Sequence, residues 1–87
     1  MQVLYSGRVQ GVGFRYTVKS VANGYEVAGT ICNLADGRVE LLGEGAEKEL
    51  EAFRQAIGES GLGHFIEREE VSWSEPRNDF RGFEIVR

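Results

Sequence analysis

The sequence has few residues that cross-link a chain or bind a metal: one cysteine, one histidine and one proline among 87 residues. A single cysteine, Cys32, cannot form an internal disulfide. One cysteine with one histidine also falls short of the usual ligand set of a zinc site. We therefore expect no metal site and a fold that the hydrophobic core alone holds together.

Long apolar runs are also missing, since none exceeds a few residues. The N-terminal segment lacks a basic flank followed by a long apolar stretch. We therefore expect neither a membrane span nor a signal peptide, and we expect a cytoplasmic location. The formal net charge of -4 argues against broad, charge-driven binding of nucleic acid. Any site for an anion has to be local.

Two segments carry apolar residues at the spacing that places them on one buried face of a helix. The first helix is predicted from Phe14, Thr17, Val18, Val21 and Ala22, and it ends at Asn23 and Gly24. The second is predicted from Ala46, Leu50, Phe53 and Ile57, and its acidic first turn suits the helix dipole.

Other apolar segments read as extended chain, two of them with the alternation typical of half-buried strands. They are residues 3–5, 26–33, 38–44, 65–73 and 83–86, and a turn at 34–37 joins the second and third as a hairpin. A turn at 75–79 interrupts the fourth strand region. Residues 1–87 are thus predicted to form one α+β domain, a ferredoxin-like split βαβ sandwich (βαββαβ) whose antiparallel sheet carries two helices on one face.

The segment between the first strand and the first helix has the composition of an anion-binding loop. Residues 7–13 contain three glycines, of which Gly11 and Gly13 permit positive φ angles and close approach of a ligand. Such a loop at a helix N-terminus points successive N–H groups into one concavity, over which Arg15 could fold as a bidentate phosphate or carboxylate ligand. From the loop alone, a tight turn beside a solvated arginine is an equal alternative, since no complete nucleotide motif is present.

The wider pattern is more specific. GRVQGVGFR at residues 7–15 resembles the signature of the acylphosphatase family, and GTICNLADGRVE at residues 29–40 resembles the family's glycine, asparagine and Asp-Gly hairpin segment. GFEI at residues 82–85 matches as well, so the resemblance covers essentially the whole chain. It implies an acylphosphatase that hydrolyses the carboxyl-phosphate bond of small acyl phosphates without a metal or an organic cofactor.

By motif position, the resemblance implies that Arg15 binds the phosphate and that Asn33 orients the attacking water. The backbone amides that would cradle the phosphate belong to Val9, Gln10, Gly11, Val12, Gly13 and Phe14. Alternation puts Asn33 on the helix side of its strand, together with Ile31. Without the motif, an asparagine that caps a turn is the simpler interpretation of Asn33.

Two departures from the family and two other functions are left open. Thr30 and Cys32 stand where many relatives carry tryptophan and a basic residue, which puts the substrate preference in question. One alternative is a non-catalytic module that binds phosphate or acyl phosphate through the same loop. The other is an RNA-binding module of this topology, which the acidic charge and the lack of an exposed aromatic pair disfavour. We expect a monomer whose partners are an acyl phosphate and inorganic phosphate or similar oxyanions, with no nucleic acid or membrane.

Overall fold

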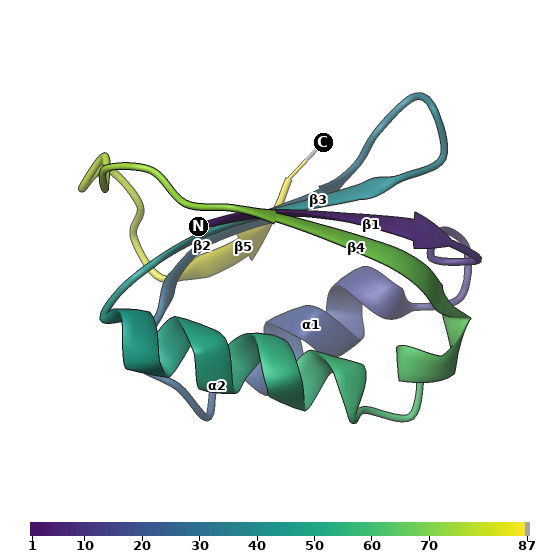
Figure 1. Cartoon of the computed structure of the whole chain (residues 1–87), viewed down its shortest axis with the longest axis horizontal. Helices are drawn as coiled ribbons and strands as arrows, with labels where there is room; N and C mark the ends of the chain where they lie inside the picture. The colour runs from purple at the N-terminus through teal and green to yellow at the C-terminus, as the bar shows by residue number, and fades with distance from the viewer. Residues whose placement is uncertain (87) are drawn as a thin grey trace.

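One mixed sheet forms the frame of the molecule. The computed structural model describes residues 1–86 and arranges five strands in the order β4-β1-β3-β2-β5 (Figure 1). They are β1 (Gln2–Gly7), β2 (Ala28–Asn33), β3 (Val39–Glu44), β4 (Ile66–Ser72) and β5 (Phe83–Ile85). β1 pairs antiparallel with β3 and β4, and β2 pairs antiparallel with β3. Arg87, the last residue of the predicted domain, lies outside the described residues.

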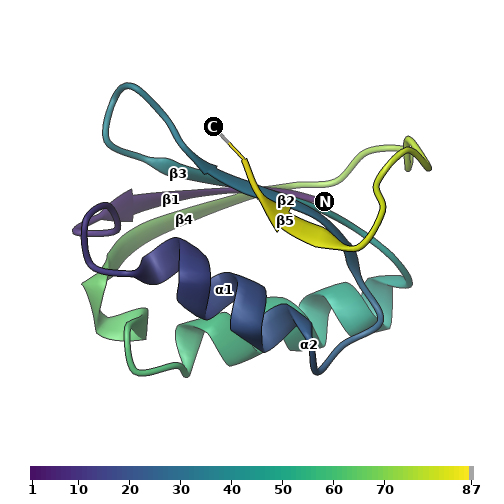
Figure 2. The same ribbon diagram turned by 180° about the vertical axis from the view of Figure 1, so that it is seen from behind.

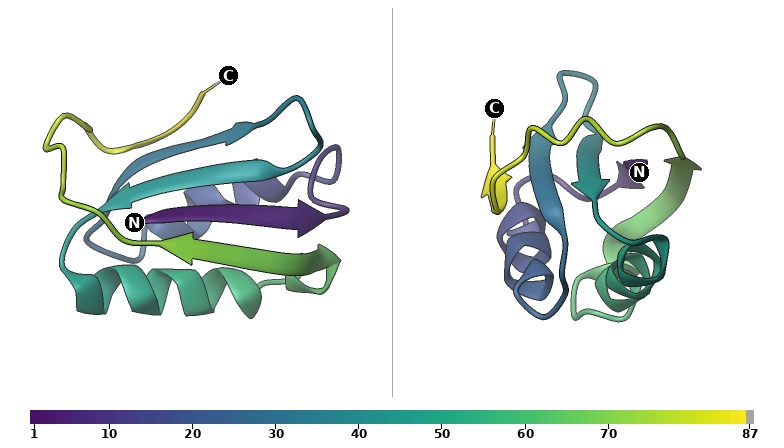
Figure 3. Two further views of the ribbon diagram at one scale, coloured as in Figure 1. Left: turned by 45° about the horizontal axis from the view of Figure 1, so that its top comes forward. Right: turned by 90° about the vertical axis from the view of Figure 1, so that its left-hand side faces the viewer.

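The last strand corrects the expectation of a wholly antiparallel sheet, because β5 runs parallel to β2. β4 and β5 stand at opposite edges of the sheet, and residues 73–82 cross from one edge to the other (Figure 3). β4 finishes at the end of the sheet where β2 begins, since Ser72 lies opposite Gln2 and β5 pairs from Gly29 onward. Residues 73–82 cross the sheet at that end, so β5 pairs with the free edge of β2 and runs in the same direction as β2.

The two helices, α1 (Phe14–Ala22) and α2 (Glu47–Gly58), lie on one face of the sheet (Figure 2). A short 3-10 turn, η1 (Gly63–Phe65), leads into β4. The predicted α+β ferredoxin-like fold with two helices on one face is confirmed. None of the helices in residues 1–86 combines the length and apolar character needed to cross a bilayer.

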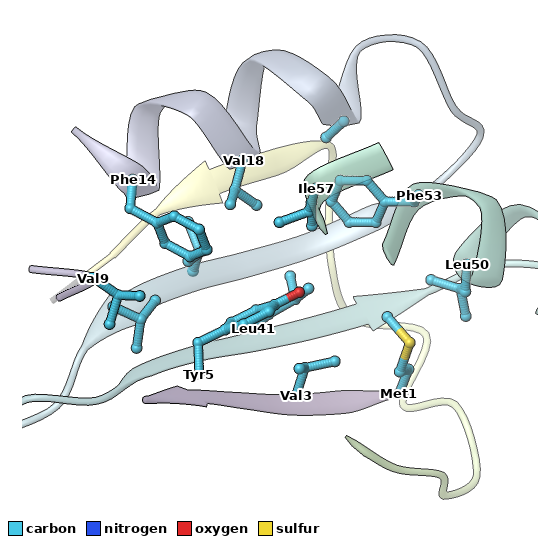
Figure 4. Packing of buried hydrophobic residues seen from close by; sticks show 13 residues of the cluster. Met1, Val3, Tyr5, Val9, Phe14, Val18, Leu41, Leu50, Phe53 and Ile57 are labelled. Atoms are coloured by element: carbon cyan, nitrogen blue, oxygen red, sulfur yellow. The ribbon is translucent and has the colours of Figure 1, made fainter. Parts of the chain in front are cut away.

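The core fills the space between the helices and the sheet (Figure 4). Its buried side chains come from both helices and from alternate positions of the central strands: Met1, Val3, Tyr5, Val9, Phe14, Val18, Ala22, Ile31, Val39, Leu41, Leu50, Phe53 and Ile57. The rings of Tyr5 and Phe14 meet edge to face at 5.2 Å, which seats the start of α1 on β1. This contact positions the loop that joins the two elements.

Gly7 allows the end of β1 to pass close to the start of β4. Its φ is 122°, a conformation that residues with a side chain rarely adopt. A Cβ at this position would collide with the Phe65 carbonyl oxygen and lie 2.8 Å from the Glu67 nitrogen. The β1–β4 register also shifts here, and the Arg8 amide donates to the Phe65 carbonyl at 3.1 Å. Glycine is therefore required at position 7, where the glycine-rich loop (residues 7–13) begins.

We expect Gly7→Ala to lower the free energy of unfolding by about 1–3 kcal/mol through the strained backbone conformation. The collision of the new Cβ with the Phe65 carbonyl adds to this loss. Gly61→Ala is the matched control, because no heavy atom lies within 4 Å of a Cβ built there. Urea unfolding of both variants beside the wild type checks the difference. Equal stability of Gly7→Ala and Gly61→Ala would contradict the close approach of β1 and β4.

Candidate active site

The glycine-rich loop presents unpaired donors beside open space. Gly11 and Gly13 have φ angles of 78° and 83°, and a Cβ built at either position would meet nothing within 4 Å. The first amide of this region that donates into α1 is that of Thr17, which bonds the Gly13 carbonyl at 3.1 Å. Within residues 1–86, the amides of residues 9–14 donate to no backbone carbonyl. Free N–H groups at a helix N-terminus are what an anion requires.

Arg15 adds a positive charge that no carboxylate neutralises within residues 1–86. By contrast, Arg38 pairs with Asp36 at 2.8 Å, and Arg54 pairs with Glu69 at 2.6 Å. Arg15 is the second residue of α1 and so follows directly on the glycine-rich loop. Its charge is therefore available to a ligand at this end of the sheet.

Asn33 is the last residue of β2 and lies opposite Val39 of β3. Its side-chain oxygen Oδ1 is buried and has no hydrogen-bond partner among the described residues. Ile31, two residues earlier and therefore on the same face, is fully buried in the core under the helices. A buried carbonyl oxygen without a donor is costly, so this atom is suited to accept a hydrogen from water or from a ligand.

Gln10 connects the glycine-rich loop to the hairpin between β2 and β3. Its side-chain nitrogen Nε2 donates to the carbonyl oxygens of Leu34 and Arg38, each at 2.9 Å. The sequence predicted a role for the backbone amide of Gln10 only. Its acceptors are backbone carbonyls 24 and 28 residues away. No pattern of side chains marks such partners, so this contact could not be found from the sequence.

The strand directions bring these groups to one end of the sheet. β1 and β2 are both antiparallel to β3, which lies between them, so they run in the same direction. The loop that follows β1 and the hairpin that follows β2 therefore lie at the same end, on the right in Figure 1. The predicted site residues come from the loop after β1, the start of α1 and the last position of β2: residues 9–14, Arg15 and Asn33.

Cys32 faces away from Asn33. Its sulfur lies 3.9 Å from Oε1 of Glu40, whose other oxygen accepts a hydrogen bond from Gln2 at 2.8 Å. Burial raises the pKa of the Cys32 thiol, and the neighbouring Glu40 carboxylate raises it further. A thiol held protonated in this way is a poor nucleophile. The departure from the family pattern at this position thus lies on the outer face of the sheet.

A separate cavity of about 230 Å³ lies at the opposite end of the sheet, partly lined by residues of the segment 73–80. Met1, Gly43 and Trp73 are among its lining residues. Met1 and Gly43 lie at the ends of β1 and β3 that are remote from Gly7 and Val39. This cavity shares no residue with the glycine-rich loop, Arg15 or Asn33.

Fold and site together define a class: a ferredoxin-like α+β domain whose loop amides and Arg15, at one end of the sheet, have no partner among residues 1–86. The chain belongs to the acylphosphatase family, whose model, described as Acylphosphatase, matches residues 1–85. The family that the motifs predicted is thereby confirmed.

Individual relatives agree with this assignment. An acylphosphatase of Listeria welshimeri is 44% identical over 82 residues, which cover 93% of this chain and 88% of that protein. An acylphosphatase of Bacillus velezensis is 51% identical over 55 residues, which are 63% of this chain and about three fifths (61%) of that relative's length. The crystal structure of an acylphosphatase from Bacillus subtilis is similar with a TM-score of 0.89 at 37% identity, covering 99% of this chain and 96% of that chain.

Proposed function

We propose that this protein hydrolyses the carboxyl-phosphate bond of small acyl phosphates and releases a carboxylate and inorganic phosphate. Membership of the acylphosphatase family supports the reaction class. The observation that supports the proposal is that β1, which leads into the loop and Arg15, and β2, which ends in Asn33, finish at the same end of the sheet. In this proposal the loop and Arg15 bind the phosphoryl group, and Asn33 orients the attacking water.

The amides of residues 9–14 and the guanidinium of Arg15 bind the phosphoryl group. Negative charge on the equatorial oxygens is met by fixed N–H dipoles and by a planar cation that can bind two oxygens at once. These interactions strengthen as the transition state develops, which accelerates the reaction instead of only binding the substrate. The leaving carboxylate has a conjugate acid with a pKa of roughly 4, so no general acid is needed.

Asn33 orients the attacking water. Its Oδ1, which has no protein partner among residues 1–86, accepts a hydrogen from the water and aligns its oxygen with the phosphorus. The bond from the water oxygen to phosphorus forms while the bond from phosphorus to the acyl oxygen breaks, and that electron pair leaves with the carboxylate. The proton of the water passes to an oxygen of the transferred phosphate.

The outer face of the sheet does not support the RNA-binding alternative. The outward residues of β1 and β3 include Gln2 and Leu4 of β1 and Glu40 and Leu42 of β3, and none of them is aromatic. Stacking of bases on a sheet of this topology needs exposed aromatic rings on these strands. Tyr5, the aromatic residue of β1, is buried on the helix side.

Hydrolysis of benzoyl phosphate, followed by its ultraviolet absorbance in excess EDTA, tests the reaction. We expect metal-independent turnover by the wild type. Phenyl phosphate should be turned over far more slowly, because its phenolate leaving group has a conjugate acid with a pKa of about 10 and none of the predicted site residues is a proton-donating acid. A folded protein that binds inorganic phosphate but does not hydrolyse benzoyl phosphate would instead be a phosphate-binding module.

Arg15→Ala should lower kcat/KM for benzoyl phosphate by at least about 100-fold and weaken the binding of inorganic phosphate. The reason is that the variant lacks the guanidinium charge that stabilises the phosphoryl oxygens. Arg15→Lys should also be poor, since a point charge cannot reproduce the planar fork. Arg68→Ala, which removes an exposed arginine of β4, is the matched control and should behave as the wild type. Full activity of Arg15→Lys would overturn the bidentate contact.

Asn33→Ala should lower kcat by about 100-fold, the scale expected for misplacing a reacting group, and change the affinity for inorganic phosphate by less than about threefold. The variant should be as stable as the wild type, since it removes a buried oxygen that has no partner among residues 1–86. Calorimetric titration with phosphate and urea unfolding check the two parts. Loss of phosphate binding as large as in Arg15→Ala would contradict the division of roles.

A further inference from the structure

The cradle and Asn33 belong to different parts of the fold, and one side chain spans them. Residues 9–14 follow β1, whereas Asn33 ends β2. Within residues 1–86, the two hydrogen bonds donated by Gln10 Nε2 are the only ones that join residues 9–14 to residues 33–38. We infer that the Gln10 side chain is a positioning residue that sets the phosphate cradle in register with Asn33. This inference rests on the function proposed above.

The geometry suits a primary amide. The carbonyl oxygens of Leu34 and Arg38 both face Nε2, and an amide nitrogen has two hydrogens to give them. The Arg38 oxygen also accepts a bond from the Leu34 amide at 2.8 Å, so it uses both lone pairs. A carboxylate in place of the amide would face two carbonyl oxygens without a hydrogen to donate. Gln10 is thus matched to its partners in both shape and charge.

The contact holds the hairpin at the point where Asn33 leaves it. Asn33 and Val39 form the last pair of the β2–β3 ladder, and the two acceptors of Gln10 are the residues immediately beyond that pair. The backbone bond from the Leu34 amide to the Arg38 carbonyl continues the ladder by one step, and Gln10 ties that step to the loop. The backbone of Asn33 is fixed relative to the loop, and with it the direction from which its carboxamide presents water.

Alignment matters more to the rate than to binding. The cradle binds phosphate through backbone amides, which remain when the Gln10 side chain is changed. In-line attack depends on the position of the water relative to phosphorus, and a displacement of about 1 Å can reduce the rate by about 100-fold. Loss of the side chain should therefore reduce kcat and leave phosphate affinity nearly unchanged.

The first experiment replaces Gln10 with methionine, which has a similar length and no donor. We expect Gln10→Met to lower kcat for benzoyl phosphate by about tenfold or more, with KM and the Kd of inorganic phosphate within about threefold of the wild type. Gln2→Met is the matched control: it removes a glutamine that donates to Glu40 at 2.8 Å on the outer face, and it should keep the wild-type kcat. Gln10→Asn keeps the amide on a shorter stem and should show a smaller loss, which provides the test if Gln10→Met does not fold.

The second experiment asks whether Gln10 acts through Asn33. In the Asn33→Ala background, Gln10→Met should lower kcat by less than about twofold, because no carboxamide is left to position. An equal loss in both backgrounds, or an unchanged kcat of Gln10→Met beside an active wild type, would overturn the inference. Absence of turnover by the wild type would instead disprove the proposed function, so the two failures are distinguishable.

Discussion

The direction of β1 and β2 on either side of β3 is the constraint on which the candidate site depends. Tyr5 of β1 and Asn33 of β2 both lie opposite Val39 of β3, so the two ladders share one reference point. A slip of one residue in the β2–β3 ladder would turn Asn33 to the outer face, because side chains alternate along a strand. The hydrophobic pattern prevents that slip, since Ile31 and Leu41 are fully buried on the helix side.

The core holds both ends of the glycine-rich loop and leaves its middle open. Val9 and Phe14 are each 1% exposed, whereas Gly11 and Gly13 lie at the surface. Phe14 packs on the ring of Tyr5, and burial raises the pKa of the Tyr5 hydroxyl, which lies in the core within range of the charges of Glu69 and Arg54. The buried side chains of Val9 and Phe14 therefore hold the two ends of the loop, while the glycines between them stay at the surface.

An acidic protein can carry an anion site when its charges are distributed unevenly. The formal net charge is -4, yet Arg15 has no carboxylate partner among residues 1–86. On α2, by contrast, Arg54 is held by Glu51 and Glu69. The departure from the family pattern at Cys32 lies on the other side of the sheet from the candidate site. Cys32 contacts Glu40 on the outer face, whereas Asn33 faces the helices. Cys32 and Asn33, neighbours in the sequence, thus have different surroundings.

Periodicity along the chain was sufficient to predict both helices, the hairpin and the face on which Asn33 lies, because these depend on residues a few positions apart. The motifs at residues 7–15 and 29–40 also indicated the family. The parallel placement of β5 and the two hydrogen bonds of Gln10 were decided only by the tertiary structure. Both join segments far apart in the sequence, and in both the acceptors are backbone carbonyls. Every residue carries such groups, so only the path of the folded chain selects which of them meet.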